Sequence, residues 1–398
     1  IDASHAGTAF SIASGLAYKF INSKNRVCVL IGDGSINEGM SFEGLNFLAD
    51  KKLPITIVIN DNQISISKNI GAIKNLFVNN SNESAKNFFK SMGFDYFFVK
   101  EGHNVEKILY TLKKSSKSKK IPIIHVKTEK GKGLKIAKKH QYKMHFSLPF
   151  DPSTGQGVSP TISGNTYGKE TSKILERLIK KDKRIYIITP ATPYASYLDD
   201  LIKKYRNKII DVGMAEQHAV GFASGLSLSG FKPIVCIQST FLQRAFDQLI
   251  HDAAFMNLPI VFLCTRSGFS GYDSPTHHGI YDIPYLRSIP NLEISYPINV
   301  AATEKIIKDS FQQKKNPKII LQPYEQVEKK VTQIFFSRNK NFLNDVNLIG
   351  NRNSKISLIC LPNQLNTCLK ILETNKEKIN LLVIQKIKPF PEKIFKKF

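Results

Sequence analysis

The chain has 398 residues, of which 42% are hydrophobic and 22% charged, and this balance excludes collagen, coiled coils and wholesale disorder. Its formal net charge of +25 comes from 48 lysines and only nine arginines, which are dispersed along the chain. A nucleic-acid-binding protein is expected to concentrate basic and aromatic groups on one face, and a membrane span needs roughly 18 apolar residues in a row, so we expect neither nucleic acid nor membrane as a partner.

Strands and helices alternate along the chain, a pattern typical of parallel sheets with helices on both faces. In the first part of the chain, the pattern predicts strands at 26–31, 54–60 and 121–127 and helices at 38–50 and 104–115. A connection rich in Gly, Lys and Pro follows at 130–156. The second part is predicted to hold strands at 184–189, 208–212, 233–238, 259–265, 292–296 and 317–321, with helices at 165–180, 214–229, 240–256 and 299–313.

A third group of elements begins after a polar, irregular stretch at 323–353, which is predicted to be a linker. It comprises predicted strands at 355–361 and 379–385 and a helix at 363–374. We therefore predict an α/β protein with tandem parallel-sheet, three-layer domains at residues 1–150 and 160–325. Residues 345–398 are expected to form a third α/β domain that is truncated.

Gly32-Asp33-Gly34-Ser35 follows a predicted buried strand and precedes a helix. In open α/β sheets, ligands bind beyond the carboxyl ends of the strands. The glycines let the backbone approach a ligand closely, and N–H groups at a helix start favour phosphate. Taken alone, such a turn is also common where its role is only structural.

The next predicted strand ends in Asn60-Asp61-Asn62-Gln63-Ile64, and 27 residues separate Gly34 from Asn62. That span holds one helix and one strand, so Asn62 is expected to lie beside Asp33 at the same edge of the sheet. Mg²⁺ prefers oxygen ligands and usually takes several of them from phosphates and water. A carboxylate, an amide oxygen and a backbone carbonyl just after it therefore predict a site for Mg²⁺ and a diphosphate. A P-loop and a Rossmann GxGxxG motif are both absent from this turn.

Glu216 lies among small and apolar residues, where a predicted strand turns into a helix. Desolvation there would raise the pKa of its carboxyl and keep a proton available. An acid in a first helical turn also complements the helix dipole without any further role. Phe241, at the end of the next predicted strand, would either stack on a planar ligand or be an ordinary core residue.

Arg244 and Arg266 are two of the nine arginines, and both lie near predicted strand ends. Arginine binds carboxylates and phosphates through two parallel hydrogen bonds. The loop at 271–291 carries Asp273 and His277, and His beside Asp is typical of proton transfer, although most loop histidines are merely solvated.

The motif GDG followed after 25–30 residues by N resembles that of thiamine-diphosphate enzymes. Four further segments, SISKNIGA, AEQHAVGFASGL, STFLQRAFDQ and the D-x-P-T-H-x-G…YLR-x-IPN stretch, are similar to the 1-deoxy-D-xylulose-5-phosphate synthase family. The resemblance implies thiamine diphosphate and Mg²⁺ as cofactors and a transketolase-like fold. The first domain would bind the diphosphate and the metal, and the second the aminopyrimidine ring, whose N1′ needs an acid as its partner.

The resemblance assigns roles to individual residues. Mg²⁺ would be bound by Asp33, Asn62 and the carbonyl of Ile64. The thiamine diphosphate would be contacted by His5, Ala6, Gly7, Gly34, Ser35, Asn62, Glu216 and Phe241. The substrates would be bound by Arg244, Arg266, Asp273 and His277. The catalytic residues would be Glu216, His5, His145, His277 and Asp273.

The implied reaction joins pyruvate to D-glyceraldehyde 3-phosphate with loss of CO₂, in a homodimer. Its product, 1-deoxy-D-xylulose 5-phosphate, feeds the non-mevalonate isoprenoid pathway and the synthesis of thiamine. One alternative is a transketolase or another thiamine-diphosphate enzyme that uses 2-oxoacids, since these share the GDG…N motif and the glutamate. A more remote one is a non-catalytic basic binding protein. The sequence also departs from the family at Leu321-Gln322-Pro323-Tyr324, where the family has an arginine in an RYP-like stretch.

Five scattered cysteines without a Cys-x-x-Cys pair indicate a reducing compartment, with neither disulfides nor a zinc site. The chain begins at Ile1 without a methionine and stops within an α/β unit, so we expect it to be part of a longer protein. The bias toward Lys, Asn and Ile is typical of an AT-rich organism. It leads us to expect the stroma of a parasite plastid of the apicoplast type, with the bacterial cytoplasm as the alternative.

Overall fold

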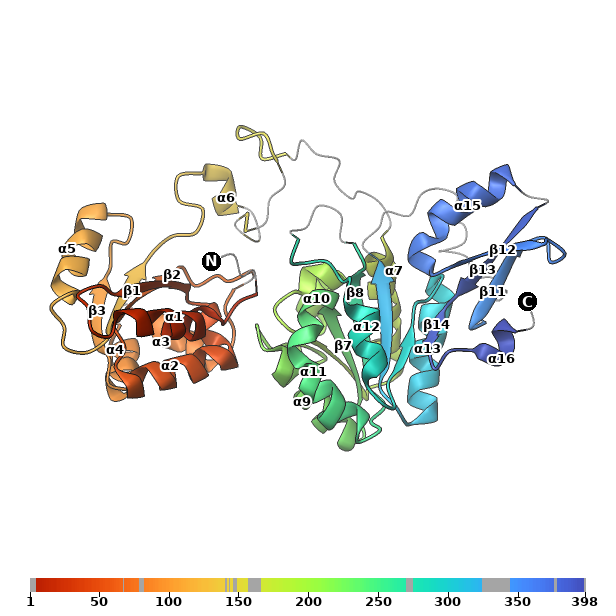
Figure 1. Ribbon diagram of the computed structural model, residues 1–398, viewed down its shortest axis with the longest axis horizontal. Coiled ribbons are helices and arrows are strands. Elements are labelled where there is room, and N and C mark those ends of the chain that lie inside the picture. The colour runs from red at the N-terminus through yellow and green to blue at the C-terminus, as the bar shows by residue number, and fades with distance from the viewer. Residues whose placement is uncertain are drawn as a thin grey trace. The chain divides into compact units, whose positions relative to one another are not determined.

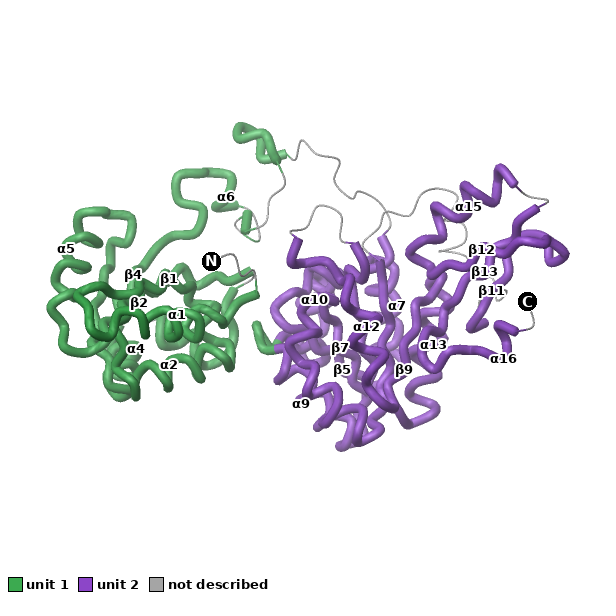
Figure 2. The backbone as a smooth tube through the Cα atoms, in the orientation of Figure 1, with its two compact units in different colours: residues 1–159, 212–215 green, residues 160–211, 216–398 purple. Residues whose placement is uncertain are grey.

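The computed structural model describes residues 5–66, 68–78, 82–139, 142, 144–145, 149–156, 166–269, 275–323, 344–375 and 378–396. The chain forms two compact units (Figure 2). Unit 1 comprises residues 1–159 and 212–215, and unit 2 comprises residues 160–211 and 216–398.

Unit 1 is built on a four-stranded sheet (Figure 1). The strand order is β1-β2-β4-β3, and every pair in it is parallel. The strands are β1 (Val27–Gly32), β2 (Ile55–Asp61), β3 (Asp95–Val99) and β4 (Pro122–Lys127). Three of them were predicted from their β-branched runs, and β3 was not. β2 alternates between fully and partly buried residues, because its two faces are covered to different extents.

Helices of unit 1 cover both faces of this sheet. The larger core joins the strands to α1 (Ala9–Ala17), α2 (Gly39–Lys51), α3 (Asn75–Val78) and α4 (Glu83–Ser91). On the other face, α5 (Val105–Ser115) packs on Val99, Ile124 and Val126. α5 begins after Asn104, whose side chain accepts a hydrogen bond from the Lys107 N–H. A short helix, α6 (Lys135–Lys139), lies within the predicted connection.

Unit 2 contains a seven-stranded sheet of order β14-β9-β10-β8-β7-β5-β6. Its strands are β5 (Ile185–Thr189), β6 (Ile209–Asp211), β7 (Lys232–Gln238), β8 (Val261–Ser267), β9 (Glu293–Ser295), β10 (Lys318–Pro323) and β14 (Lys386–Lys388). All pairs are parallel except β14 with β9. The central strands β7 and β8 are buried almost throughout, as expected for a parallel sheet with both faces covered.

The helices of unit 2 include α7 (Tyr167–Lys181), α8 (Asp199–Lys204), α9 (Glu216–Leu228), α12 (Asp282–Ser288) and α13 (Val300–Gln313). The helix predicted at 240–256 is helical over most of its length but is not one regular α-helix. The segment is instead divided into α10 (Ser239–Leu242), a 3₁₀ turn, α11 (Phe246–Gln248) and a π-helical stretch at Leu249–Ala254. The break occurs because Ala245 leaves the helical region of backbone space, with φ −108° and ψ 26°.

The C-terminal residues group with unit 2 and form a second, three-stranded sheet of order β11-β13-β12. Its elements are β11 (Val346–Gly350), β12 (Ile356–Cys360), α15 (Leu365–Thr374) and β13 (Ile379–Ile384), and α16 (Glu392–Phe395) follows β14. β11 lies within the stretch 323–353, which was predicted to be a linker because it is polar and irregular. It is ordered as a strand by antiparallel pairing with β13.

All five cysteines are free thiols. Within the described ranges, no helix is both long and apolar enough to cross a membrane.

We predict opposite effects for two glycine-to-alanine substitutions in the helices of unit 1. A Cβ at Gly44 in α2 would lie 2.6 Å from the Phe10 Cβ, so Gly44→Ala should lower the free energy of unfolding by about 1–3 kcal/mol. Nothing lies within 4 Å of a Cβ at Gly15 in α1, so Gly15→Ala should be neutral or stabilise by up to about 1 kcal/mol. Urea unfolding measures both. Equal effects would contradict the close α1–α2 packing.

Candidate functional site

Asp33 lies directly after β1, at the carboxyl edge of the unit 1 sheet, and is only 1% exposed. The backbone N–H of Gln63 and the side-chain Nδ2 of Asn69 each donate a hydrogen bond to its Oδ2, both at 2.7 Å. The Asp33 N–H donates to the Asn60 carbonyl at 3.2 Å. The structure therefore brings Asp33 together with the turn that follows β2, where Asn62 and Ile64 lie.

The Asp33 carboxyl is in an environment that opposes its charge. Burial and then the nearby Asp61 carboxylate raise its pKa, backbone hydrogen bonds from the 62–63 turn and Gly34 lower it, and the net result is a pKa of about 6. Ionisation of the Asp33 carboxyl therefore costs free energy, and a cation bound beside it would offset that cost.

The turn after β2 has an unusual backbone. Gln63 is in the left-handed region, with φ +61°, which is uncommon for a residue other than glycine. Asn62 is partly buried, and its Oδ1 accepts a hydrogen bond from the Ile64 N–H at 3.0 Å. The Gln63 carbonyl accepts one from the Asn69 N–H at 3.3 Å. The turn is therefore a defined loop that leaves partly exposed oxygens at the edge of the sheet.

Gly34 and Ser35 lie opposite this turn. A Cβ at Gly34 would lie 2.4 Å from the Ser65 Cβ, so only glycine fits there. Ser35 begins the 3₁₀ turn Ser35–Asn37 that leads toward α2, and its carbonyl accepts a hydrogen bond from the Ser41 hydroxyl at 2.7 Å. His5, Ala6 and Gly7 lie in the turn that leads into α1, and Gly7 has φ +88°.

Lys130 is a candidate that the sequence did not single out, since it is one of 48 lysines. Its Nζ donates to the Ser65 carbonyl at 2.5 Å and lies 2.7 Å from Nδ1 of His145. Partial burial lowers the pKa of Lys130. Partial desolvation of the His145 ring, and then repulsion by Lys130, lower the pKa of His145 to about 4, although the residue keeps contact with solvent. At neutral pH this imidazole is therefore uncharged and its Nδ1 is an acceptor.

In unit 2, Glu216 is the first residue of α9 and is 5% exposed. Arg244 Nε lies 3.3 Å from its Oε2, but this oxygen accepts no hydrogen bond from any residue in the described ranges. Burial raises the pKa of Glu216, and the positive charge of Arg244 opposes that rise. Glu216 is thus a buried acid whose Oε2 is ion-paired with Arg244 but accepts no hydrogen bond from the described residues.

Other predicted residues of unit 2 lie at the ends of β7 and β8. The Phe241 ring contacts the His277 ring edge to face, with centroids 5.4 Å apart. Arg266 is in the left-handed backbone region, with φ +62°, and its guanidinium lies 5.6 Å from the Tyr194 ring centroid. Asp273 lies outside the described residues.

Asp282, which the sequence did not single out, organises the loop that carries His277. The Ser267 hydroxyl donates to Asp282 Oδ2 at 2.7 Å, and Gly268 and Gly279 exchange backbone hydrogen bonds at 2.7 and 3.1 Å. A Cβ at Gly279 would lie 2.7 Å from the same carboxylate oxygen. Burial raises the pKa of Asp282 to about 6, although hydrogen bonds from serine hydroxyls oppose the rise.

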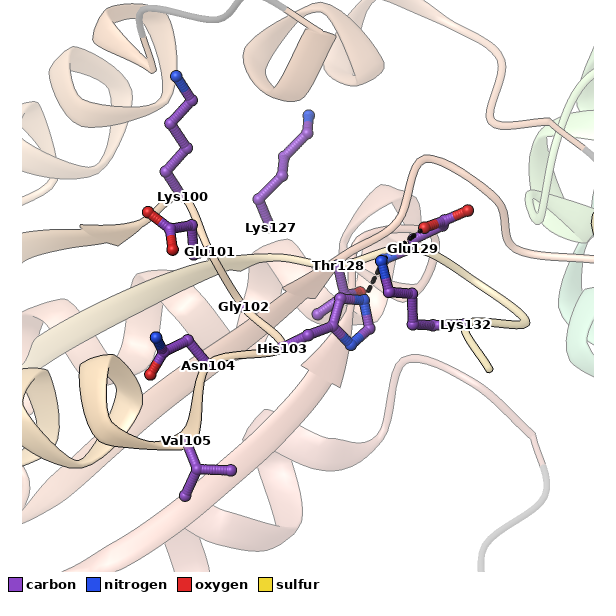
Figure 3. Close-up of a pocket in the computed structure, with 10 residues that line it drawn as sticks. All are labelled: Lys100, Glu101, Gly102, His103, Asn104, Val105, Lys127, Thr128, Glu129 and Lys132. Carbon is purple, nitrogen blue, oxygen red and sulfur yellow. Dashed lines mark hydrogen bonds and ion pairs between the residues drawn. The ribbon is translucent and has the colours of Figure 1, made fainter. Parts of the chain in front are cut away.

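A separate open pocket of about 710 Å³ lies beyond the carboxyl ends of β3 and β4 in unit 1 (Figure 3). It is lined by Lys100, Glu101, Gly102, His103, Asn104, Val105, Lys127, Thr128, Glu129 and Lys132. None of these is a predicted site residue. Among the described residues there is also no cluster of three or more His, Cys, Asp and Glu side chains that would hold a metal ion. A metal site of the predicted kind would depend on one carboxylate with amide and carbonyl oxygens.

Two family models match the chain. One is described as 1-deoxy-D-xylulose-5-phosphate synthase and matches residues 1–87, and the other is described as the transketolase pyrimidine binding domain and matches residues 164–329.

Proteins with the name 1-deoxy-D-xylulose-5-phosphate synthase are similar over most of the chain. The protein of Clostridium tetani is 33% identical over 99% of this chain and 69% of its own length. The protein of Malacoplasma penetrans is 35% identical over 96% of this chain and 68% of its own length. The protein of Buchnera aphidicola is 39% identical over 80% of this chain and 54% of its own length. The chain thus spans between 54% and 69% of these relatives. All three are bacterial, which gives no support to the expected plastid.

Solved structures show the same fold. A split-gene transketolase, described as an inactive β4 tetramer, matches 59% of this chain and 76% of its own with a TM-score of 0.50 and 20% identity. A transketolase variant from Pichia stipitis matches 98% of this chain and 71% of its own chain, with a TM-score of 0.50 and 14% identity. The predicted transketolase-like α/β fold is confirmed.

The raised pKa of Asp282 predicts a pH dependence of stability. Because the folded pKa of about 6 exceeds the ordinary 3.8, the protonated carboxyl stabilises the fold below pH 3.8, and this contribution is lost as the pH rises through 6. Between pH 4 and pH 7, Asp282→Asn should therefore gain about 2–3 kcal/mol of unfolding free energy relative to the unsubstituted chain. Urea unfolding at both pH values measures this, with Asp200→Asn, at an exposed carboxylate, as control. A pH-independent difference would refute the assignment.

Proposed function

The chain belongs to the 1-deoxy-D-xylulose-5-phosphate synthase family, and on this basis we propose that it carries out the thiamine-diphosphate-dependent condensation of pyruvate with D-glyceraldehyde 3-phosphate. The products would be 1-deoxy-D-xylulose 5-phosphate and CO₂. The observation that carries the proposal is Glu216, a buried acid whose Oε2 has no hydrogen-bond partner among the described residues. An acid of this kind is what N1′ of the aminopyrimidine requires.

The residues of unit 1 fit a magnesium-bound diphosphate. Asp33 offers a buried carboxylate whose pKa is raised by burial and by Asp61, and Asn62 and Ile64 offer an amide and a carbonyl oxygen on the adjacent turn. Three oxygens leave room for phosphate and water in an octahedral Mg²⁺ shell. The N–H groups of Gly34 and Ser35, at a helical start, would bind the diphosphate. At the same edge of the sheet, the Ser65 carbonyl accepts a hydrogen bond from Lys130 Nζ.

In unit 2, Glu216 would bind the aminopyrimidine ring and Phe241 would stack on it. When bound, thiamine diphosphate supplies the electron sink for decarboxylation of a 2-oxoacid. Glu216 would hold a proton at N1′, since its raised pKa favours the protonated form. His5, the neutral His145 and His277 would accept or donate protons near the reacting groups, with Asp273 beside His277 in the sequence.

Arg244 and Arg266 would bind the carboxylate of pyruvate and the phosphate of the aldehyde, for which a guanidinium is suited. Gln322 lies at the end of β10, where the family has an arginine. It is 1% exposed, and its Nε2 donates to the Thr171 hydroxyl at 2.7 Å, so it would not replace a phosphate ligand. We further propose a homodimer, an isoprenoid-precursor role and, from the bacterial relatives, the bacterial cytoplasm.

An assay with each substrate omitted in turn separates this function from its alternatives. With thiamine diphosphate and Mg²⁺, we expect CO₂ and 1-deoxy-D-xylulose 5-phosphate only when pyruvate and the aldehyde phosphate are both present. Two-carbon transfer from a ketose phosphate without pyruvate would instead identify a transketolase. No turnover, with salt-dependent retention on nucleic acid and no stabilisation by the cofactor, would support a non-catalytic basic binding protein.

We predict that Asp33→Ala weakens thiamine diphosphate binding at limiting Mg²⁺ by about 10-fold or more, because the metal loses its carboxylate ligand. Isothermal titration at several Mg²⁺ concentrations measures this. Asp50→Ala, which removes an exposed carboxylate of α2, is the matched control. Unchanged cofactor affinity in Asp33→Ala would refute the metal assignment.

We predict that Glu216→Gln leaves cofactor affinity within a few-fold and lowers kcat by about 10²-fold or more, because an amide cannot share a proton with N1′. The control is Glu392→Gln, which neutralises an exposed acid of the same unit. Near-normal kcat in Glu216→Gln would remove this residue from the proposed chemistry.

A further inference from the structure

A row of buried and partly buried polar side chains crosses three adjacent strands of unit 1. The Tyr96 hydroxyl on β3 lies 2.5 Å from Nδ1 of His125 on β4, and Nε2 of His125 lies 2.8 Å from Oδ2 of Asp61 at the end of β2. His125 is 1% exposed and Asp61 is fully buried. In the neutral ring, Nε2–H donates to Asp61 and Nδ1 accepts from Tyr96, so both ring nitrogens are satisfied.

Lys127 joins this row to α3. Its Nζ donates to Asp61 Oδ2 at 3.1 Å and to the Phe77 carbonyl at 2.9 Å. The same carbonyl accepts a hydrogen bond from Nε2 of Gln63 at 3.4 Å. We refer to Asp61, His125, Tyr96 and Lys127 together as the Asp61 network.

The Asp61 network is directly connected to the turn Asn62–Ile64. Asp61 precedes the turn in the chain, so fixing its side chain fixes the end of β2. Gln63 is held by two hydrogen bonds. Its backbone N–H donates to the Asp33 carboxylate, and its side-chain Nε2 donates to the Phe77 carbonyl. Its left-handed backbone is unfavourable for a residue with a side chain and persists only where the surroundings enforce it.

Stability alone does not account for this arrangement. A fully buried carboxylate is costly, and apolar residues of similar volume are often equally or more stabilising than a buried ion pair. Asp61 Oδ1 also accepts no hydrogen bond from the described residues, which adds to that cost. The network does, however, restrict the position of the strand end from which the turn begins.

We propose that the Asp61 network is a positioning device that fixes the turn Asn62–Ile64 in the geometry needed to bind Mg²⁺. The inference rests on the proposed function, because Asn62 and Ile64 are metal ligands only under that proposal. Its members are positioning residues, since they act on the metal through the turn. Groups behind the ligands of a metal typically change its affinity by about 10–100-fold when removed.

Hydrogen exchange in the cofactor-free chain tests the device without the metal. His125→Phe keeps a ring and removes both nitrogens, so we expect peptides covering 62–66 to exchange about 10-fold faster or more under native conditions. Ile123→Ala, at a fully buried position of the same face of β4, is the control for general loosening of the core. His125→Gln, whose amide can still donate to Asp61, should restore slow exchange.

The Mg²⁺ concentration for half-maximal thiamine diphosphate binding is the second readout. We expect it to rise about 10-fold or more in His125→Phe, little in His125→Gln and little in Ile123→Ala. Equal exchange rates and equal Mg²⁺ requirements in His125→Phe and Ile123→Ala would overturn the inference while leaving the proposed function intact. If the unsubstituted chain binds no cofactor at any Mg²⁺ concentration, the proposed function fails, and with it the assignment of the turn to a metal.

Discussion

The constraint on which unit 1 depends is the burial of one carboxylate, Asp33, at the carboxyl end of a parallel strand. Its neighbours donate hydrogen bonds to it, yet its pKa stays raised because solvent is excluded and Asp61 lies nearby. A cation bound beside such a carboxylate would stabilise its ionised form. Three neighbouring features hold the Asp33 carboxylate in place. They are the glycine beside it, the left-handed backbone of Gln63 and the ordered turn after β2.

Unit 2 uses the same principle with another acid. Glu216 is buried at the start of α9, near the positive charge of Arg244, and keeps one oxygen without a hydrogen bond from the described residues. Asp282 is a third buried carboxyl. The Ser267 hydroxyl donates to its Oδ2, but its Oδ1, like Oε2 of Glu216, accepts no hydrogen bond from the described residues. Neither burial nor an unfilled hydrogen-bonding position therefore distinguishes a functional acid from a structural one, and Glu216 is set apart by the AEQHAVGFASGL segment in which it lies.

Most strands of the three sheets could be predicted because β-branched runs between turn residues are a local signal. β3, β11 and β14 were missed, since their runs are short and depend on pairing with neighbouring strands. The motifs located Asp33, Asn62 and Glu216 because each lies in a segment that resembles the family. Lys130 and His125 could not be found this way, because one is a lysine among 48 and the other is a histidine within an apolar strand. Only their hydrogen bonds in the folded structure, to Ser65 and to Asp61, identify them.

The most direct test of this account is a crystal structure of the chain grown with thiamine diphosphate and Mn²⁺, in which anomalous scattering locates the metal. We predict a single strong peak within about 2.0–2.4 Å of an Asp33 carboxylate oxygen, the Asn62 amide oxygen and the Ile64 carbonyl, with diphosphate oxygens completing the shell. A metal bound elsewhere, or a cofactor bound with Asp33 still enclosed by Gln63 and Asn69 and out of contact with metal, would contradict it.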